Sequence, residues 1–317
     1  MHPAFSVIFF TTLSGAGYGL LVWTALAALL RQPSRPLLVS LLLALALVTV
    51  GLLSSMAHLG KPQRAWRAFS QWRTSWLSRE GVASMLTYVP ALLLGMALLP
   101  GMIAADANGA SAGLNAFGTA SAIALIACAL ATVWCTAMIY ASLKPIPAWR
   151  HGLVVPVYLL FALFCGGLLH AAIVGWHGVS TSNMAGFAAM VAAIALAACK
   201  LRYWRDIDRA PLPATRGAAV GLPDREVTVF ERPHTESNYL TREMAFVVAR
   251  KHARALRILA LLSFALVPLA CMLPVWLLVH VDAAPWFTLA AIAALAGAFV
   301  ERWLFFAEAK HLVTLYY

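Results

Sequence analysis

The sequence predicts an all-α integral membrane protein with eight transmembrane helices. Of its 317 residues, 62% are hydrophobic and only 11% are charged, and the mean hydropathy is +0.82. These values are too apolar for a soluble globular protein and are typical of a polytopic membrane protein. Eight apolar runs follow one another along the chain, separated by polar or turn-forming residues. The whole chain is therefore expected to form a single membrane domain.

The first four apolar runs cover about residues 5–30, 37–57, 82–104 and 114–143. The first is uncharged and long enough to cross a hydrocarbon core of roughly 30 Å with some tilt. It is not expected to be a cleaved signal peptide, because Met-His-Pro supplies no basic segment before it and the run is too long. Pro90 lies inside the third run and predicts a kink there. Lys144 and Pro145 end the fourth run.

The last four apolar runs cover about residues 153–176, 181–199, 258–281 and 285–300. Between the sixth and the seventh lies a long polar loop at 200–257, which four prolines interrupt before residue 234. The five cysteines all lie in apolar runs and form no CxxC pair, so they are expected to be packing residues. They cannot supply the four thiolates of an iron–sulfur cluster, and the sequence predicts no such cluster in this chain.

The distribution of cations predicts the orientation of the chain. Of the 23 Lys and Arg residues, only Arg31 and Arg35 fall on the side opposite to both termini. The positive-inside rule then places both termini and the 200–257 loop in the cytoplasm of a bacterium, with the chain in the inner membrane. The net charge of +11 is explained by these membrane-edge cations, and no nucleic-acid-binding motif accompanies them.

A basic and aromatic segment, residues 54–81, follows the second apolar run. Its cations and tryptophans are Lys61, Arg64, Arg67, Arg73, Arg79, Trp66, Trp72 and Trp76. Such side chains suit the headgroup region, because the ring or aliphatic stem stays in apolar surroundings while the polar end reaches water. Composition alone is equally consistent with an ordinary membrane-anchored loop.

The order of residues makes this segment more specific. It reads His-Leu-Gly-Lys-Pro at 58–62, Arg-Ala-Trp-Arg at 64–67 and Ser-Trp-Leu-Ser-Arg-Glu at 75–80. Two other patches are Tyr-Ala-Ser at 140–142 and Gly297 with Arg302 and Phe305. Together they resemble membrane anchors of the dimethyl sulfoxide reductase type. These anchors belong to a wider quinone-reactive family that also serves polysulfide and nitrite reductases and cytoplasmic sulfite dehydrogenases.

The resemblance directs attention to residues that could serve a quinone, whose two oxygens take up two electrons and two protons. His58 is the leading candidate for proton exchange, because an imidazole is donor or acceptor near neutrality; the alternative is an interfacial histidine bonded to water or headgroups. Glu80 is the only acid before Asp106 and stands where the chain re-enters lipid beside Arg79. An acid at such a depth marks a proton path, an ion pair or both.

The remaining candidates would bind the quinone rather than exchange protons with it. Tyr140 could donate its phenol to a quinone oxygen, or be an ordinary interfacial tyrosine. Ser14 lies in the first helix, which the resemblance makes one wall of a quinone cleft; its alternative role is close helix contact. Arg79 and Arg64 complete the candidate set, although Arg64 could instead hold lipid headgroups or a partner subunit.

Two other classes of protein stay open at this point. A haem-bearing electron carrier would need paired histidines, and His170 and His280 both lie toward the outer face; the resembled family is haem-free. A membrane transporter would need midplane charges or broken helices in matching halves, and these signs are mostly missing.

The resemblance implies a quinone-binding membrane anchor without haem or iron–sulfur cluster. Its expected partners are an iron–sulfur subunit of the four-cluster ferredoxin type and a molybdopterin catalytic subunit. Because the loops that resemble the docking face are predicted to be cytoplasmic, cytoplasmic sulfite oxidation with ubiquinone or menaquinone is favoured. The alternative is the anchor of a dimethyl sulfoxide or related reductase that oxidises menaquinol.

Overall fold

The structure is a computed structural model that describes residues 4–57, 59–108, 113–180, 183–231, 248–278 and 281–315, with backbone only for 104–108 and 248–251. Throughout these ranges the ordered elements are helices, without a strand. Eight helical segments are long and apolar enough to cross a membrane, by length and composition. The predicted all-α class with eight transmembrane helices is confirmed.

The crossing segments are α1 (Phe5–Leu29), α2 (Ser34–Met56), α3 (Trp76–Asn108), α4 (Ala116–Ala141), α5 (Val154–Trp176), α6 (Asn183–Arg209), α8 with α9 (Val248–Leu261 and Val267–Leu277) and α10 (Ala283–Ala307). Shorter elements are the 3₁₀ helices η1 (Pro62–Gln71) and η4 (Leu312–Leu315) and the one-turn helix α7 (Arg216–Ala219). Local chemistry fixes two of the helix starts. The Asn115 side chain accepts a 2.8 Å hydrogen bond from the Gly118 N–H at the start of α4, and Asp282 caps α10 through Ala284 N–H.

Two helices continue well past the apolar runs of the sequence. α6 extends to Arg209 and α10 to Ala307, so polar residues follow apolar ones along the same helix without a break. Helical continuation keeps the backbone hydrogen bonds satisfied. It also carries Lys200, Glu301 and Arg302 into the interior of the bundle, where all three are buried.

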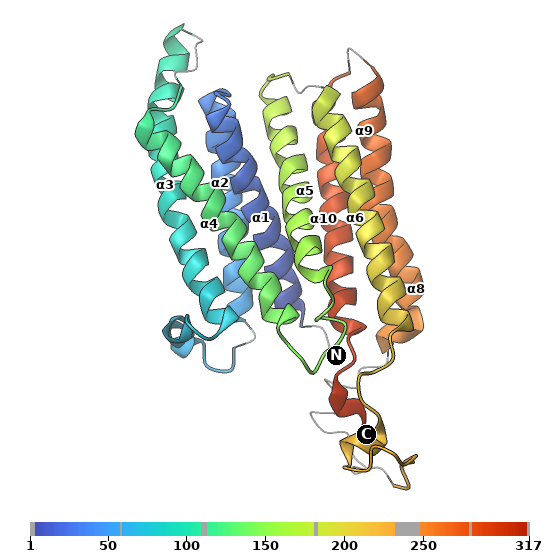
Figure 1. The fold of residues 1–317 in the computed structure, drawn as a ribbon. Helices are drawn as coiled ribbons and strands as arrows, with labels where there is room; N and C mark the ends of the chain where they lie inside the picture. Colours follow the sequence, from blue (N-terminus) through green and yellow to red (C-terminus); the bar gives the residue numbers. More distant parts are fainter. Residues whose placement is uncertain are drawn as a thin grey trace.

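The helices lie side by side along a common direction (Figure 1). Both ends of the chain, η1, and the described residues after α6 gather at the lower end in that view. α1 and α5 form the centre: 67% of the residues in the most apolar stretch of each are buried, against 28% in α6. α1 packs against α2, α4 and α5, and α5 packs against α10, so these two helices join the halves of the bundle.

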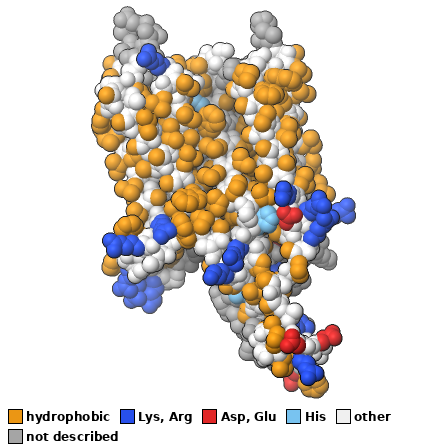
Figure 2. All heavy atoms as spheres, viewed as in Figure 1, with side chains coloured by type: hydrophobic (Ala, Val, Ile, Leu, Met, Phe, Trp, Pro, Cys, Tyr) orange, Lys and Arg blue, Asp and Glu red, His pale blue; other side chains and the backbone are white. Residues whose placement is uncertain are grey.

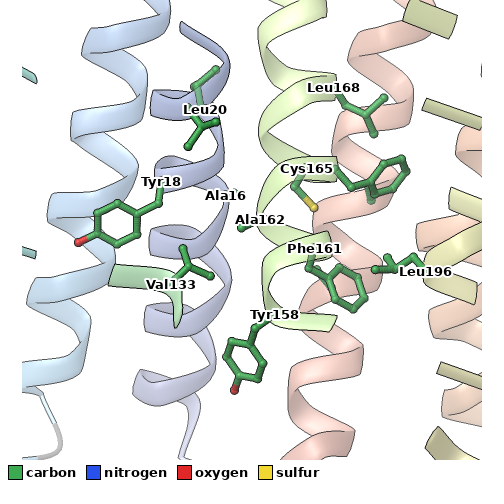
Figure 3. Close-up of a cluster of buried hydrophobic side chains, with 14 of the residues drawn as sticks. Ala16, Tyr18, Leu20, Val133, Tyr158, Phe161, Ala162, Cys165, Leu168 and Leu196 are labelled. Atoms are coloured by element: carbon green, nitrogen blue, oxygen red, sulfur yellow. The ribbon is translucent and has the colours of Figure 1, made fainter. Parts of the chain in front are cut away.

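The central crossing of α1 and α5 depends on two glycines. A Cβ atom on Gly19 would collide with the backbone of Ala162, and one on Gly166 would collide with the backbone of Gly19. The main chains of the two helices therefore touch directly, a contact that membrane helices achieve with small residues. Tyr18 adjoins Gly19 on α1, and Tyr158 lies one turn below Ala162 on α5 (Figure 3).

The seventh crossing segment contains a wide turn. α8 passes into a π-helical turn, η3 (Leu262–Leu266), before α9 begins. Pro268 explains the turn, because in a regular α-helix its ring would collide with the carbonyl of Phe264 and leave one carbonyl unpaired. Gly297 of α10 packs against the backbone of Phe264 at this turn, where no side chain would fit.

The outer surface of the helices is apolar. Figure 2 shows hydrophobic side chains over the helical part of one face, whereas most of its Lys and Arg side chains gather toward the lower end. Large side chains such as Leu42, Ile103 and Ile292 are more than 60% exposed. An apolar surface of this extent on a soluble protein would drive aggregation, whereas lipid covers it without cost.

Candidate functional site

The basic, aromatic loop of residues 59–75 folds as η1 against the start of α3. Trp66 and Trp72 are exposed, and each carries a neighbouring guanidinium over its ring, from Arg67 at 5.6 Å and Arg73 at 5.5 Å. Arg64 is also exposed on this loop. The structure therefore places Arg64 on the outside of the protein, where lipid headgroups or a partner could reach it.

Arg79 ties this loop to α3. Its Nε donates to the carbonyl of Trp72 at 3.0 Å and its Nη2 donates to the carbonyl of Arg73 at 2.7 Å, while the guanidinium lies 4.3 Å from the Trp76 ring. The donors of Arg79 thus cap the end of the loop, which makes it a positioning residue for the start of α3 in this structure.

Glu80, one residue further, points into the bundle. It is 5% exposed, and its Oε1 has no hydrogen-bond partner in the part of the chain that the structure describes. Glu80 acts electrostatically on Tyr18 of α1 and on Cys135 and Tyr140 of α4. The carboxyl therefore lies among groups from three helices, at the end of the bundle that carries the 59–75 loop.

The Tyr18 phenol is a polar group that interacts with Glu80 and was not among the candidates from the sequence. Tyr18 is 1% exposed, and its hydroxyl interacts with the side chain of Ser84 on α3. In Figure 3 the ring points away from α5, with its oxygen on the far side. The spacing Thr11, Ser14, Tyr18 puts all three on one helix face, a signal that could have been read from the sequence.

That face of α1 lines a small buried cavity of about 20 Å³. Ser14 lies on its wall, but its Oγ already donates to the carbonyl of Phe10 at 2.6 Å. Thr12 is different, because its hydroxyl has no partner among the described groups. The other walls come from α4, α5 and α10: Val133, Thr136, Tyr158, Phe161, Ala162, Cys165, Ala298 and Arg302. A cavity of this size admits about one water molecule.

Tyr140 occupies a cluster of aromatic rings between α4, α5 and α10. Its ring centroid lies 5.3 Å from that of Trp149 and 6.0 Å from that of Tyr158, with Phe305 and Phe306 at similar distances. Trp149 is itself fixed, since its Nε1 donates to the carbonyl of Phe305 at 2.9 Å. The Tyr140 phenol is thereby held beside Tyr158, at the same end of the bundle as Glu80.

A buried ionic triad lies on the other side of Tyr158. Nζ of Lys200 is 2.5 Å from Oε1 of Glu301, and Nε of Arg302 is 2.6 Å from Oε2 of the same carboxylate. Arg302 also stacks over the Tyr158 ring at 3.8 Å. The cation distribution along the sequence placed Lys200 and Arg302 at the membrane edge, and the structure places both inside the bundle. The charged pair 301–302 next to an apolar run is the sequence signal for this burial.

Of the three histidines singled out in the sequence, His170 alone falls within the described residues. His58, the leading sequence candidate, is not among the described residues, and neither is His280. His170 is buried, with its Nδ1 3.4 Å from the Ser40 hydroxyl, and it lines an apolar cavity of about 680 Å³ between α1, α5, α6 and α10. Within the described ranges, no group of three or more His, Cys, Asp or Glu side chains could hold a metal ion.

Eight membrane-crossing helices, with buried polar groups gathered at one end beneath a basic loop, define a multi-pass membrane protein. Residues 1–307 match the family model of the DMSO reductase anchor subunit (DmsC). The chain is also 33% identical to the C-subunit of the sulfite dehydrogenase from Allochromatium vinosum, with 100% of this chain and 99% of that protein covered. The chain belongs to the DMSO reductase anchor subunit family. It is a membrane anchor of an oxidoreductase complex, as the sequence predicted.

Proposed function

We propose that this chain binds a quinone at the end of the bundle that carries Glu80 and the 59–75 loop. There it would pass electrons between the quinone pool and an iron–sulfur subunit, which serves a molybdopterin catalytic subunit. The observation that carries the proposal is the meeting of two buried polar side chains, Glu80 and Tyr18, beneath this loop, with Glu80 Oε1 lacking a hydrogen-bond partner among the described residues. Buried polar atoms without partners are costly, so they indicate a bound group that completes them.

The chemistry of these residues fits a quinone headgroup. Its oxygens accept hydrogen bonds, and each needs a proton when the quinone is reduced to the quinol. The Tyr18 phenol is a donor, the Glu80 carboxyl can hold or release a proton, and His58 would add a second proton carrier in this proposal. Since the cavity beside Ser14 and Tyr18 admits water but no ring, binding requires its lining side chains or the 59–75 loop to move.

Sulfite is the substrate that we propose for the catalytic partner. The support is the full-length similarity to a protein named as the C-subunit of a sulfite dehydrogenase. The electrons would then flow from sulfite to the quinone pool. The family name favours a second candidate, a dimethyl sulfoxide reductase in which electrons flow from menaquinol to the catalytic partner.

The position of the chain ends bears on the orientation of the chain in the membrane. Both ends of the described chain, the 59–75 loop and the described residues after α6 share one end of the bundle. We propose that this end faces the cytoplasm of a bacterium, with the chain in the inner membrane, because nearly all of its cations are there. The catalytic partner would then be cytoplasmic as well.

The test uses membranes in which this chain is expressed with its neighbouring subunits. Addition of sulfite should reduce a short-chain quinone, and addition of dimethyl sulfoxide to quinol-loaded membranes should have no effect. The reverse pattern would support the reductase candidate instead. Assembled complex that shows neither reaction would contradict quinone exchange by this anchor.

A further inference from the structure

Six charged side chains from α6, α8, α10 and the segment after α10 form a string in which negative and positive charges alternate. In order they are Asp208, Arg257, Glu308, Lys200, Glu301 and Arg302. Arg257 binds Asp208 through contacts of 2.6 and 2.8 Å and donates to Glu308 at 2.8 Å. We call this set the charge string.

The two halves of the charge string meet at Trp204. The centroid of its ring lies 4.9 Å from Nζ of Lys200 and 5.4 Å from Cζ of Arg257. Lys200 and Glu308 also interact electrostatically with each other. The string is therefore continuous in charge from Asp208 to Arg302, although its members come from separate helices.

The charge string runs from the surface to the interior. The side chain of Asp208 is 55% exposed, that of Glu308 is 8% exposed and that of Glu301 is fully buried. Its outer half lines an open cavity of about 820 Å³, which we call the vestibule; His151 and Lys310 are also on its wall. Water in the vestibule thus reaches Asp208, Arg257 and Glu308.

The inner end of the charge string meets two water-sized cavities. One, of about 10 Å³, is lined by Lys200, Tyr203, Glu301, Tyr158 and Arg302. The other is the 20 Å³ cavity beside Ser14 and Tyr18, and Tyr158 and Arg302 border both. The Arg302 guanidinium and the Tyr158 hydroxyl interact with each other on the wall that the two cavities share. Each cavity has room for about one water that these atoms would hold.

A purely structural role explains only part of this arrangement. Ion pairs can tie α6, α8 and α10 together, but buried pairs are weak evidence for stability because desolvation offsets their attraction. Ionisable groups inside a membrane bundle more often mark a path for protons or ions. Polar groups that line water-sized cavities, in line with a vestibule, fit a proton path.

We propose that Lys200 and Glu301 pass protons between the vestibule and the cavity at Tyr18, and so deliver the protons that reduction of the quinone requires. This inference rests on the proposed function. Per quinone reduced, two electrons arrive from the partner subunits and two protons are taken up. The Lys200 ammonium gives a proton to the Glu301 carboxylate, and Glu308, which exchanges protons with water in the vestibule, reprotonates the amine. Glu301 then releases the proton to water beside Tyr158, from which it moves to a quinone oxygen.

The surroundings of Glu301 suit this transfer. The titratable and charged groups that face it are Lys200 and Tyr203 from α6, Tyr158 from α5 and Arg302 on its own helix. Arg302 remains protonated throughout, and its positive charge therefore stabilises the ionised carboxylate of Glu301 between proton transfers. At the entrance, burial raises the pKa of Glu308, which brings this carboxyl closer to exchange near neutral pH.

The decisive variant is Glu301→Gln, which keeps the shape of the side chain but cannot carry a proton as an acid. In the assembled complex, quinone reduction should fall about a hundredfold or more. Electron delivery to an artificial dye that accepts from the partner subunits should be unchanged. The infrared difference spectrum on quinone reduction should also lose a protonated-carboxyl band that the wild type shows.

Glu226→Gln is the matched control, because Glu226 is an exposed acid in the described segment after α6. It should leave both activities and the infrared band unchanged. If Glu301→Gln does not assemble, Glu308→Gln tests the proton path instead. This variant is expected to assemble because Arg257 keeps its ion pair with Asp208. Glu308→Gln should slow quinone reduction and shift its pH profile.

Wild-type rate and an unchanged pH profile in whichever of these two variants assembles would overturn the proton path alone. Absence of quinone reduction in the assembled wild type would overturn the proposed function and this inference with it.

Discussion

Gly19 on α1 and Gly166 on α5 press backbone against backbone at the centre of the bundle. α1 carries Ser14 and Tyr18, whereas α5 carries Tyr158, so this single contact sets how the polar side chains of the two helices face each other. The precision of the candidate site thus depends on two residues without side chains.

Gly19→Ala is expected to destabilise the protein, because its new methyl group would overlap the main chain of Ala162. Overpacking of this kind costs about 1 to 3 kcal/mol. Gly15→Ala on the same helix is the matched control, since nothing lies within 4 Å of its new methyl group. Thermal unfolding of the detergent-solubilised protein should show a lower midpoint for Gly19→Ala only. Equal midpoints would show that α1 and α5 can move apart at this crossing without loss of stability.

Glu80→Gln and His58→Ala are expected to slow quinone turnover while the complex stays assembled. Loss of a general acid or base costs about a hundredfold to ten-thousandfold in rate. Dye-linked oxidation by the partner subunits should survive in both variants, because that route bypasses the anchor. Normal quinone kinetics in His58→Ala would return that residue to an interfacial role. Normal kinetics in Glu80→Gln would show that this carboxyl takes no part in proton exchange.

The two phenols should respond in different ways. Tyr18→Phe removes a hydroxyl that interacts with Ser84, so the protein should lose at most about one hydrogen bond, on the order of 1 kcal/mol, of stability. Quinone binding should nevertheless weaken by about one hydrogen bond, on the order of 1 kcal/mol, in Tyr18→Phe and in Tyr140→Phe. The measurement is the KM for a short-chain quinone beside the melting curve. A lower midpoint with unchanged KM for Tyr18→Phe would indicate a structural hydroxyl.

A reporter fused after Tyr317 should be active only in the form that works in the cytoplasm. The reason is that nearly all cations lie at the end of the bundle that carries both chain ends. The control is the same reporter inserted at Gly178, in the exposed turn between α5 and α6 at the opposite end. Periplasmic activity of the fusion after Tyr317 would reverse the orientation and remove the argument for a cytoplasmic catalytic partner.

Cross-links to the iron–sulfur partner should concentrate on the 59–75 loop and the 200–257 segment. Exposed Trp and Arg side chains, such as Trp66 and Arg64, favour such an interface because they combine apolar area with directional donors. Mass spectrometry of the cross-linked complex is the measurement. Links confined to residues 113–115 or Asp282 would place the partner at the other end.

The helices could be predicted from the sequence because each apolar run is a local property, long enough by itself to cross a bilayer. The partners of individual residues could not. Lys200 and Glu301 are about a hundred positions apart, and only the packing of α6 on the rest of the bundle shows that they pair. Glu80 could be predicted as a candidate because it is an isolated acid at a membrane boundary. Tyr18 by itself carries no such signal in an apolar run, and only its helical spacing from Thr11 and Ser14 could have pointed to it.

The pairing of Lys200 with Glu301 also bears on how the chain is made. α6 leaves the ribosome long before α10, so for that interval the Lys200 ammonium has no carboxylate from α10 to neutralise it inside the bundle. The insertion machinery or interfacial water must stabilise this unpaired ammonium until the last helix is synthesised. A chain that stops before α10 would therefore remain an unfinished membrane protein, open to quality-control proteases, although most of its helices are already in place.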